Sequence, residues 1–185
     1  MGGNLRVADV TIGEFTSYIE SRKDASGLNV SGLDLSNMLM QDLNLRGANL
    51  TGCDLSKSDL SGSDLTRANL RGANLDEAIL RNTIFTRANL TIVDMRGADL
   101  RCANFEGANL SGAASNSWQS TARVIGANMH KANAQNANFS NAILVRVNFN
   151  SSILYGANFE GANITRVSLQ DAKYDIDAFD RAIGV

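Results

Sequence analysis

The stretch that decides the fold is residues 58–72, which read SDLSG SDLTR ANLRG. A bulky apolar residue stands at the centre of each group of five, and a small residue stands two places before it. Between these two lies a polar residue, here Asp or Asn. In an extended chain, residues i−2 and i point to one side and residue i−1 points to the other. Each pentad therefore offers one small and one large side chain to an interior and one polar side chain to the outside.

This pattern continues over most of the chain. Every fifth residue over 30–110 is bulky and apolar, and the same reading resumes one place out of phase over 124–174, where only Ala134 is small. All 24 positions that stand two places before these centres within 48–172 are Ala, Ser, Cys, Thr or Val. A period of five fits neither a helix nor a long strand, so the chain must bend every few residues and stack on itself.

Pentads such as ANLRG at 68–72, SDLSG at 58–62 and ANFEG at 103–107 resemble the pentapeptide-repeat family, whose consensus is A(D/N)LXX. The resemblance covers residues 26–174 and implies an all-β solenoid, namely a right-handed, four-sided β-helix with four pentads per coil. We therefore expect about seven coils and a length of ~34 Å at ~4.8 Å per coil. Four-sided coils also place residues that are 20 apart on the same face.

The N-terminal segment, residues 1–25, departs from the pentad. Residues 11–14 read TIGE, a capping box that predicts a short helix through Arg22. An exposed coil end is an unpaired sheet edge, so we expect this helix to cap the solenoid, with Ile12, Phe15 and Ile19 on one side. The first coil is expected to be wider than the others, because its four small-residue positions are large: Leu28, Leu33, Met38 and Leu43.

The C-terminal segment, residues 175–185, also abandons the pentad and predicts a second short helix with an apolar tail. Its apolar side would cap the rod, form a homodimer contact, or do both. The candidate dimer residues are Ile176, Phe179 and Ile183.

A phase change at residues 115–121 predicts a loop or bulge in one face, and this stretch contains the only tryptophan. Two placements of Trp118 stay open. It folds inward to fill the space left by small residues, as large aromatic side chains usually do, or it projects outward with Gln119 as a binding contact on a loop.

An asparagine ladder runs along one expected face, and we interpret it as a structural amide stack. If the break shortens the repeat by one residue and leaves the number of coils unchanged, Asn128 and Asn148 continue this ladder. Its earlier members are Asn29, Asn49, Asn69, Asn89 and Asn109.

The composition argues against most catalytic chemistry. The chain has 185 residues, a formal net charge of −2, one histidine and two cysteines, so neither a disulfide framework nor a zinc knuckle is expected. His130 should face solvent alone, Cys53 reads as a buried apolar residue and Cys102 stands near a corner. We therefore expect no catalytic site, no metal and no cofactor. The absence of a long apolar run and of a signal layout at Met1 predicts a cytoplasmic protein with no membrane association.

One surface pattern is not required by the repeat. Four arginines stand two places past a centre on what should be a single face: Arg67, Arg87, Arg146 and Arg166. Ile84 and Ile143 replace the outward Asp or Asn and would share that face, flanked by Val145. An arginine-and-aliphatic face is a candidate protein-binding surface. The alternative is scattered, solvated charge.

These observations favour a non-catalytic module that presents a rigid surface to a protein partner. A weaker resemblance, to Qnr-type quinolone-resistance proteins, implies a DNA mimic that protects DNA gyrase or topoisomerase IV. Residues 116–174 carry two acids against five bases, net +3, whereas such a mimic should be acidic along its length. Net charge and few exposed aromatics also argue against direct nucleic-acid binding. Secretion as a bacterial effector, known for some family members, is a third option without a readable signal here.

Overall fold

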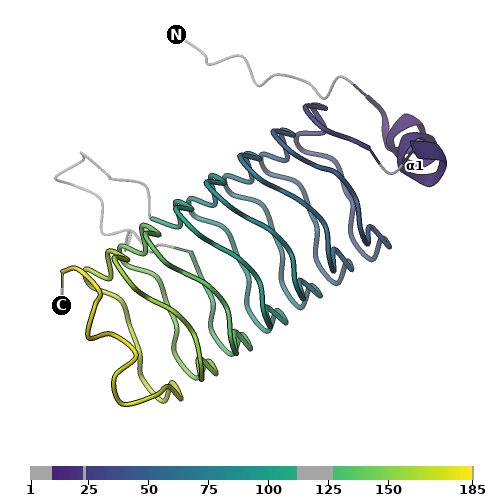
Figure 1. The fold of residues 1–185 in the computed structure, drawn as a ribbon. Coiled ribbons are helices and arrows are strands. Elements are labelled where there is room, and N and C mark those ends of the chain that lie inside the picture. Colours follow the sequence, from purple (N-terminus) through teal and green to yellow (C-terminus); the bar gives the residue numbers. More distant parts are fainter. Residues whose placement is uncertain (1–9, 23, 112–126, 185) are drawn as a thin grey trace, which may run out of the picture.

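The computed structural model describes residues 10–22, 24–111 and 127–184, and it shows a straight rod of stacked coils (Figure 1). One helix, α1 (Ile12–Arg22), lies at the N-terminal end, and it is the only α-helix of the described residues. The β-structure consists of single-residue parallel bridges that join positions 20 apart in successive coils, such as Asn29 to Asn49. The expected right-handed, four-sided β-helix is confirmed.

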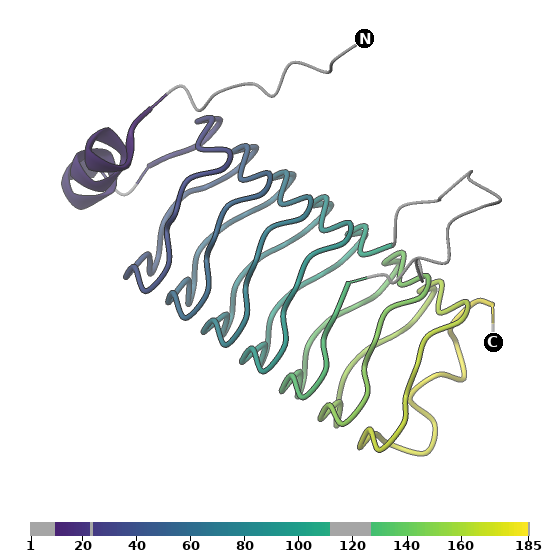
Figure 2. The same ribbon diagram turned by 180° about the vertical axis from the view of Figure 1, so that it is seen from behind.

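Four columns of bridges run along the rod and define four faces, whose coils are seen from behind in Figure 2. Face 1 begins with Asp24, face 2 with Asn29, face 3 with Asp34 and face 4 with Leu39. Each face therefore repeats every 20 residues before the insertion at residues 112–126.

The register changes across that insertion. Asn128 bridges Asp94 on face 3, and Ile143 bridges Asn109 on face 2, so the bridged residues are 34 apart instead of 20 and 14 residues are extra to the coil. The expectation that Asn128 continues the Asn29 ladder is therefore wrong, and the same holds for Asn148, which follows Asn128 on face 3.

The physical reason is that the ladder continues from residue 110 to residue 127 with the same hydrogen-bond pattern as elsewhere in the rod. Ala127 N donates to Leu110 O at 2.9 Å, and Asn128 N donates to Val93 O at 2.9 Å. The pentads thus resume at Ala127. The expected loop at 115–121, with Trp118 and Gln119, lies outside the described residues.

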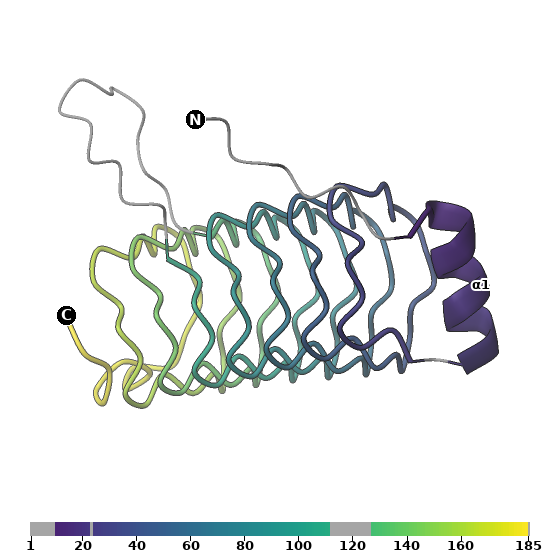
Figure 3. The same cartoon turned by 90° about the horizontal axis from the view of Figure 1, so that it is seen from above.

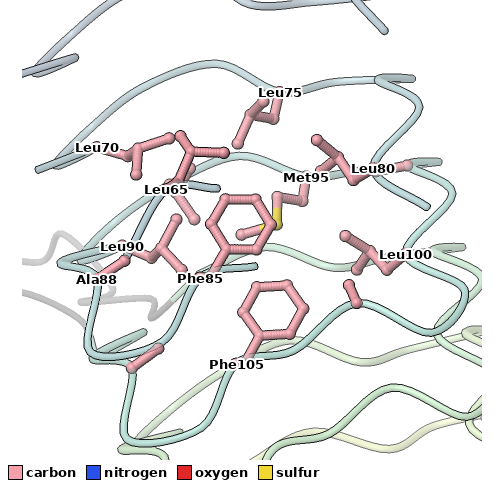
Figure 4. Packing of buried hydrophobic residues seen from close by; sticks show 14 of the residues in the cluster. Leu65, Leu70, Leu75, Leu80, Phe85, Ala88, Leu90, Met95, Leu100 and Phe105 are labelled. Atoms are coloured by element: carbon pink, nitrogen blue, oxygen red, sulfur yellow. The ribbon is translucent and has the colours of Figure 1, made fainter. Parts of the chain in front are cut away.

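The interior is filled by the pentad centres. Figure 4 shows side chains entering the core from the four sides of one coil, each at most 1% exposed: Leu65, Leu70, Leu75 and Leu80. Fully burying one such side chain contributes about 1.5–3 kcal/mol. The centres therefore point inward, as the alternation of the sequence predicts.

A column of stacked phenylalanine rings runs through the core beneath face 1. The centroids of Phe85 and Phe105 are 4.8 Å apart, those of Phe105 and Phe139 4.9 Å, and those of Phe139 and Phe159 5.1 Å. The interplanar angles are 9°, 8° and 8°. The second of these pairs spans the insertion, so side-chain packing agrees with the 34-residue register.

The small column is also buried, and its hydroxyl groups are satisfied by the backbone. Ser63 Oγ donates to Met40 O at 2.6 Å, and Thr83 Oγ1 donates to Leu60 O at 2.9 Å. Among the described residues no buried side-chain nitrogen or oxygen lacks a partner. Polar residues are therefore tolerated in this column because each meets a carbonyl within reach.

Helix α1 lies across the N-terminal end of the rod, as Figure 3 shows. Its capping box is formed: Glu14 N donates to Thr11 Oγ1 at 3.3 Å, and Thr11 N donates to Glu14 Oε2 at 2.7 Å. The bonds that Thr11 N and Thr11 Oγ1 donate to Glu14 Oε2 hold the pKa of Glu14 below its usual value. Phe15 and Ile19 are buried against the wide first coil, whereas Ile12 is 44% exposed and does not share their role.

The C-terminal segment is not the expected helix. Residues 176–181 form consecutive turns closed by i to i+3 bonds, such as Ala178 N to Asp175 O and Ala182 N to Phe179 O, both 3.0 Å. The chain then returns to the β-ladder, where Ile183 forms a bridge to Asn163.

Candidate functional site

The corners of the coil set the directions of the surface side chains. The residue two places past each centre has a positive φ, 59° at Arg67 and 57° at Arg87, and the turn is closed by Ala68 N donating to Leu65 O at 2.9 Å. A β-turn of type II needs a positive φ at its third residue, which favours glycine. A non-glycine residue at this position carries strain and places an exposed side chain on an edge of the rod.

The outward Asp and Asn side chains do more than meet solvent. Asp64 Oδ1 accepts a bond from Thr66 N at 2.9 Å, and Asn49 Oδ1 accepts from Thr51 N at 3.2 Å. Amides also pair along the rod: Asn49 Nδ2 donates to Asn29 Oδ1 at 2.9 Å. The expected structural amide stack is confirmed there. Sequence reasoning predicted the amide pairs but not the bonds from the backbone, although Asx turns are the known signal of such bonds.

The structure does not place the four predicted arginines in one line. Arg67 and Arg87 end pentads of face 1 and stand directly before face 2, while Arg146 and Arg166 form the far edge of face 2. The expectation of one shared corner is wrong, because the 14 extra residues shift every later pentad by one face relative to the assumed register. The four arginines instead border face 2 from its two sides.

The aliphatic candidates divide in the same way. Ile84 lies on face 1, whereas Ile143 and Val145 lie on face 2, and Ile143 is 42% exposed. Ile84 is half-buried. The expectation that the two isoleucines share a face is wrong for the same reason as for the arginines.

The strongest ion-pair cluster lies on face 4. Arg101 Nε and Nη2 donate to the two oxygens of Asp99 at 2.8 and 2.6 Å, and Arg81 Nε donates to Asp99 Oδ2 at 2.6 Å. The hydrogen bonds from Arg101 lower the pKa of Asp99 to about 2, with a second contribution from Arg81 and against the opposing effect of partial burial. This carboxylate stays ionised over the physiological range and is held in place by its two partners.

The remaining candidates for chemistry are separated from one another. His130 Nδ1–H donates to Asn150 O at 2.9 Å, so this imidazole is half-buried and tied to the next coil. Cys53 is buried, which raises the pKa of its thiol to about 11, and Cys102 is exposed. In the described ranges no three His, Cys, Asp or Glu side chains are arranged to hold a metal ion.

Shallow grooves occur at the two ends of the rod. One, of about 420 Å³, lies where the C-terminal turns meet the last coils, between Glu160 and Asp175. The other, of about 350 Å³, lies between α1 and Leu39, which is 74% exposed. None of the helices in the described part of the chain has the length and apolar character needed to cross a membrane.

The candidate dimer residues have three different environments. Phe179 packs inward on Phe159, with ring centroids 4.6 Å apart, and therefore extends the ring column. Ile176 is fully exposed, and Ile183 is 60% exposed although its backbone is bridged. The predicted common apolar side does not form, because the turns direct Phe179 into the core.

Among solved structures the chain is similar to several repeat proteins. QnrB1, a plasmid-mediated fluoroquinolone resistance protein, is 19% identical with a TM-score of 0.42, covering 80% of this chain and 92% of that chain. HetL, a pentapeptide repeat protein involved in heterocyst differentiation regulation from the cyanobacterium Nostoc sp. strain PCC 7120, is 22% identical with a TM-score of 0.39, covering 95% of this chain and 97% of that chain. Rfr23 from the cyanobacterium Cyanothece 51142 is 23% identical with a TM-score of 0.35, covering 95% and 100%.

A search of curated proteins finds no significant match. The family model for pentapeptide repeats, by contrast, matches the sequence in eight copies. The matched residues are 29–67, 63–101, 83–113, 122–150 and 142–173. They cover most of the coils described above, on both sides of the insertion. The chain therefore belongs to the pentapeptide repeat family.

Proposed function

We propose that the protein is a non-catalytic module that binds a protein partner on a rigid outer surface. The observation that carries this proposal is the closed interior: the pentad centres and small positions fill the core, and the buried polar atoms of the described residues are all satisfied. Because the core is filled, only the outer surface of the rod is available for binding.

That outside is ordered before any partner arrives. The outward carboxamides and carboxylates are bonded to the backbone two residues on, as in Asp59 to Ser61 N at 2.9 Å and Asn104 to Glu106 N at 3.0 Å. Side chains held in this way lose little conformational entropy on association. A flat, preorganised surface of this kind suits recognition of another macromolecule better than turnover of a small substrate.

The test is affinity capture with the immobilised full chain from a lysate of the source cell, followed by binding of the purified candidate in solution. We expect one protein to bind, with one partner molecule per chain. We expect no change in the covalent structure of either protein. A chain unfolded by heat on the same resin is the control. Failure to capture any protein that rebinds in purified form would overturn the proposal.

Protection of a type II topoisomerase is the narrower alternative. It needs carboxylates along the rod that stand in for DNA phosphates, and Glu160 is the one carboxylate in residues 127–166. A gyrase supercoiling assay with a fluoroquinolone tests it directly. Supercoiling restored by micromolar protein would support this alternative, and unchanged inhibition would exclude it at that concentration.

We also propose that the C-terminal end is the homodimer contact, through the exposed Ile176 and Ile183. Because Phe179 is packed on Phe159, Phe179→Asp would disturb the fold and is a poor probe. Ile176→Asp should lower the mass measured by light scattering from that of a dimer to that of a monomer. Leu39→Asp, which changes another exposed aliphatic residue at the other end of the rod, is the matched control. A wild-type mass of one chain would rule the dimer out.

A further inference from the structure

Face 2 differs from the other faces in its charge. Its seven described pentads contain three arginines and no Asp or Glu, whereas each of faces 1, 3 and 4 has carboxylates in several of its pentads, such as Asp64, Asp94 and Asp99. The pentads of face 2 are 28–32, 48–52, 68–72, 88–92, 108–111, 142–146 and 162–166.

The cations on and beside face 2 are not neutralised. Within the described residues, no carboxylate lies within ion-pair distance of the three arginines of the face or of the two that directly precede it. These five are Arg71, Arg146, Arg166, Arg67 and Arg87. The ion pairs that do form lie on the other faces, for example Arg46 with Asp64 at 2.7 Å on face 1 and Arg96 with Asp94 at 3.0 Å on face 3. Glu106 and Glu160 flank the near edge from face 1, and Glu160 is paired with Arg181 at 3.6 Å.

Exposed aliphatic side chains lie among these arginines. Ile92 is 40% exposed and Ile143 is 42% exposed, and they lie at the far edge and in the column of face 2, respectively. The rest of the column is neutral amide, fixed by bonds such as Asn89 Nδ2 to Asn69 Oδ1 at 3.0 Å. The face therefore combines unpaired guanidinium groups with apolar contacts on a rigid neutral background.

We propose that face 2 is the partner-binding surface and that it takes an acidic protein surface containing aliphatic residues. This inference rests on the proposed function and deepens it. Arginine is enriched at protein interfaces, and charge complementarity selects the partner. From Arg67 to Arg166 the arginines span four coil rises, roughly 20 Å at ~4.8 Å per coil, which is the length of a short strand or a few helical turns.

A protein partner fits this face better than a nucleic acid does. The exposed isoleucines have no counterpart on a sugar–phosphate backbone, and the outward columns of the face contain no aromatic residue on which bases could stack. The carboxylates of the three other faces would also repel a long polyanion, while an acidic patch confined to one protein surface avoids them.

The experiment measures fluorescence anisotropy of three labelled probes with the full chain: a 20-residue peptide repeating Glu-Glu-Ile-Glu, an all-Glu peptide of that length, and a 20-base-pair DNA duplex. The test variant is Arg146→Glu with Arg166→Glu. The matched control is Lys131→Glu with Lys173→Glu, which changes the net charge by the same amount on faces 3 and 4 in the same half of the rod. If the double arginine variant fails to fold by circular dichroism, Arg71→Glu replaces it.

We expect the Glu-Ile peptide to bind most tightly, the arginine variant to weaken it at least about tenfold, and the lysine variant to weaken it less than about threefold. Equal weakening by both variants, tighter binding of the duplex, or no binding of the peptide would each overturn the assignment.

The two proposals fail separately. A partner captured by the full chain that still binds the arginine variant with wild-type affinity would overturn face 2 as the site and leave the binding function standing. Lack of any captured partner would instead overturn the proposed function.

Discussion

The rod before the insertion and the rod after it use the same coil but different side chains. Over 24–111 the centres are mainly leucine, and the faces carry ion pairs such as those of Asp99. Over 127–174 phenylalanine recurs at the centres, the outward column is mainly asparagine, and the one ion pair there joins Glu160 to the C-terminal turns. The coil geometry thus depends on the size and polarity at each pentad position and not on the particular residue.

This comparison separates two sources of stability. In the first part, charge-assisted bonds on the surface supplement a leucine core. In the second part, stacked rings and amide pairs continue with few ion pairs beside them, such as Phe139 with Phe159 and Asn148 Nδ2 with Asn128 Oδ1 at 3.0 Å. The two parts should therefore respond differently to truncation of the core and to acid.

The largest effect is expected from truncating the ring column. Phe139 contacts the rings of Phe105, Phe149 and Phe159 at centroid distances of 4.9, 5.7 and 5.1 Å. Phe139→Ala should lower the free energy of unfolding by about 3–5 kcal/mol, because it leaves a cavity and removes ring contacts. Urea unfolding followed by circular dichroism measures this.

The matched variant is Leu65→Ala, at the same column on the other side of the insertion. Leu65→Ala should lower the free energy of unfolding by about 2–5 kcal/mol. The loss should be near the lower value if the leucine makes fewer contacts than the phenylalanine. A Leu65→Ala cost equal to or above that of Phe139→Ala would mean that the ring column adds nothing beyond volume.

A smaller effect is expected from acid. Asp99 has a pKa of about 2 in the folded protein against an ordinary value of 3.8, so its stabilisation is present above about pH 4 and is lost as the pH falls toward 2. After allowance for solvent screening, we expect the free energy of unfolding of the wild type to fall by about 1 kcal/mol more than that of Asp99→Asn over this pH interval.

Hydrogen exchange locates that loss. Amides of the first part should lose protection at higher pH than amides of 139–164. The reason is that Asp59 and Asp64, whose carboxyl pKa values are also lowered, lie in the first part. Asp171→Asn, which removes an exposed carboxylate from the second part, is the control. Uniform loss along the rod would contradict the distinction between the two parts.

The smallest effect is expected from removing the insertion. Deleting residues 113–126 joins Gly112 to Ala127 and gives the uninterrupted pentads ANLSG and ANMHK, which restores a spacing of 20 between bridged residues. The free energy of unfolding should change by no more than about 1 kcal/mol, because closing a loop of this length has a modest entropic cost. A loss above about 3 kcal/mol would show that the insertion packs on the coil, and would favour the inward placement of Trp118.

Much of the fold could be read from the sequence because its signals are local. The alternation within each pentad fixes which side chains point inward, and the box at Thr11 and Glu14 fixes the start of α1. The C-terminal segment shows where this fails. Ile176, Phe179 and Ile183 are apolar and have the spacing of one helix face. The packing of Phe179 on the ring column and the pairing of Ile183 with Asn163 nevertheless favour turns over a helix.

The surface assignments depended on register, which is not local. Apolar residues at every fifth position from Val124 onward leave open which of the four faces each later pentad occupies, although the ANM motif at 127–129 continues the SG at 111–112 and could have indicated the true register. An error of one pentad moves every later residue to the neighbouring face. This is why the four arginines were predicted on one edge and are found on the two sides of face 2.

The sequence by itself determined the coil, the contents of its core and the N-terminal cap, since each follows from neighbours within a few residues along the chain. The tertiary structure alone decided which side chains share a face across residues 112–126, how the C-terminal turns close on the ring column, and that face 2 has no carboxylate. These features depend on bridges between residues 34 apart, such as Asp94 with Asn128, where Met95 N donates to Asn128 O at 2.8 Å. Only the stacking of one coil on the next selects them, because the backbone pairs equally well in any register that keeps small and large residues in their columns.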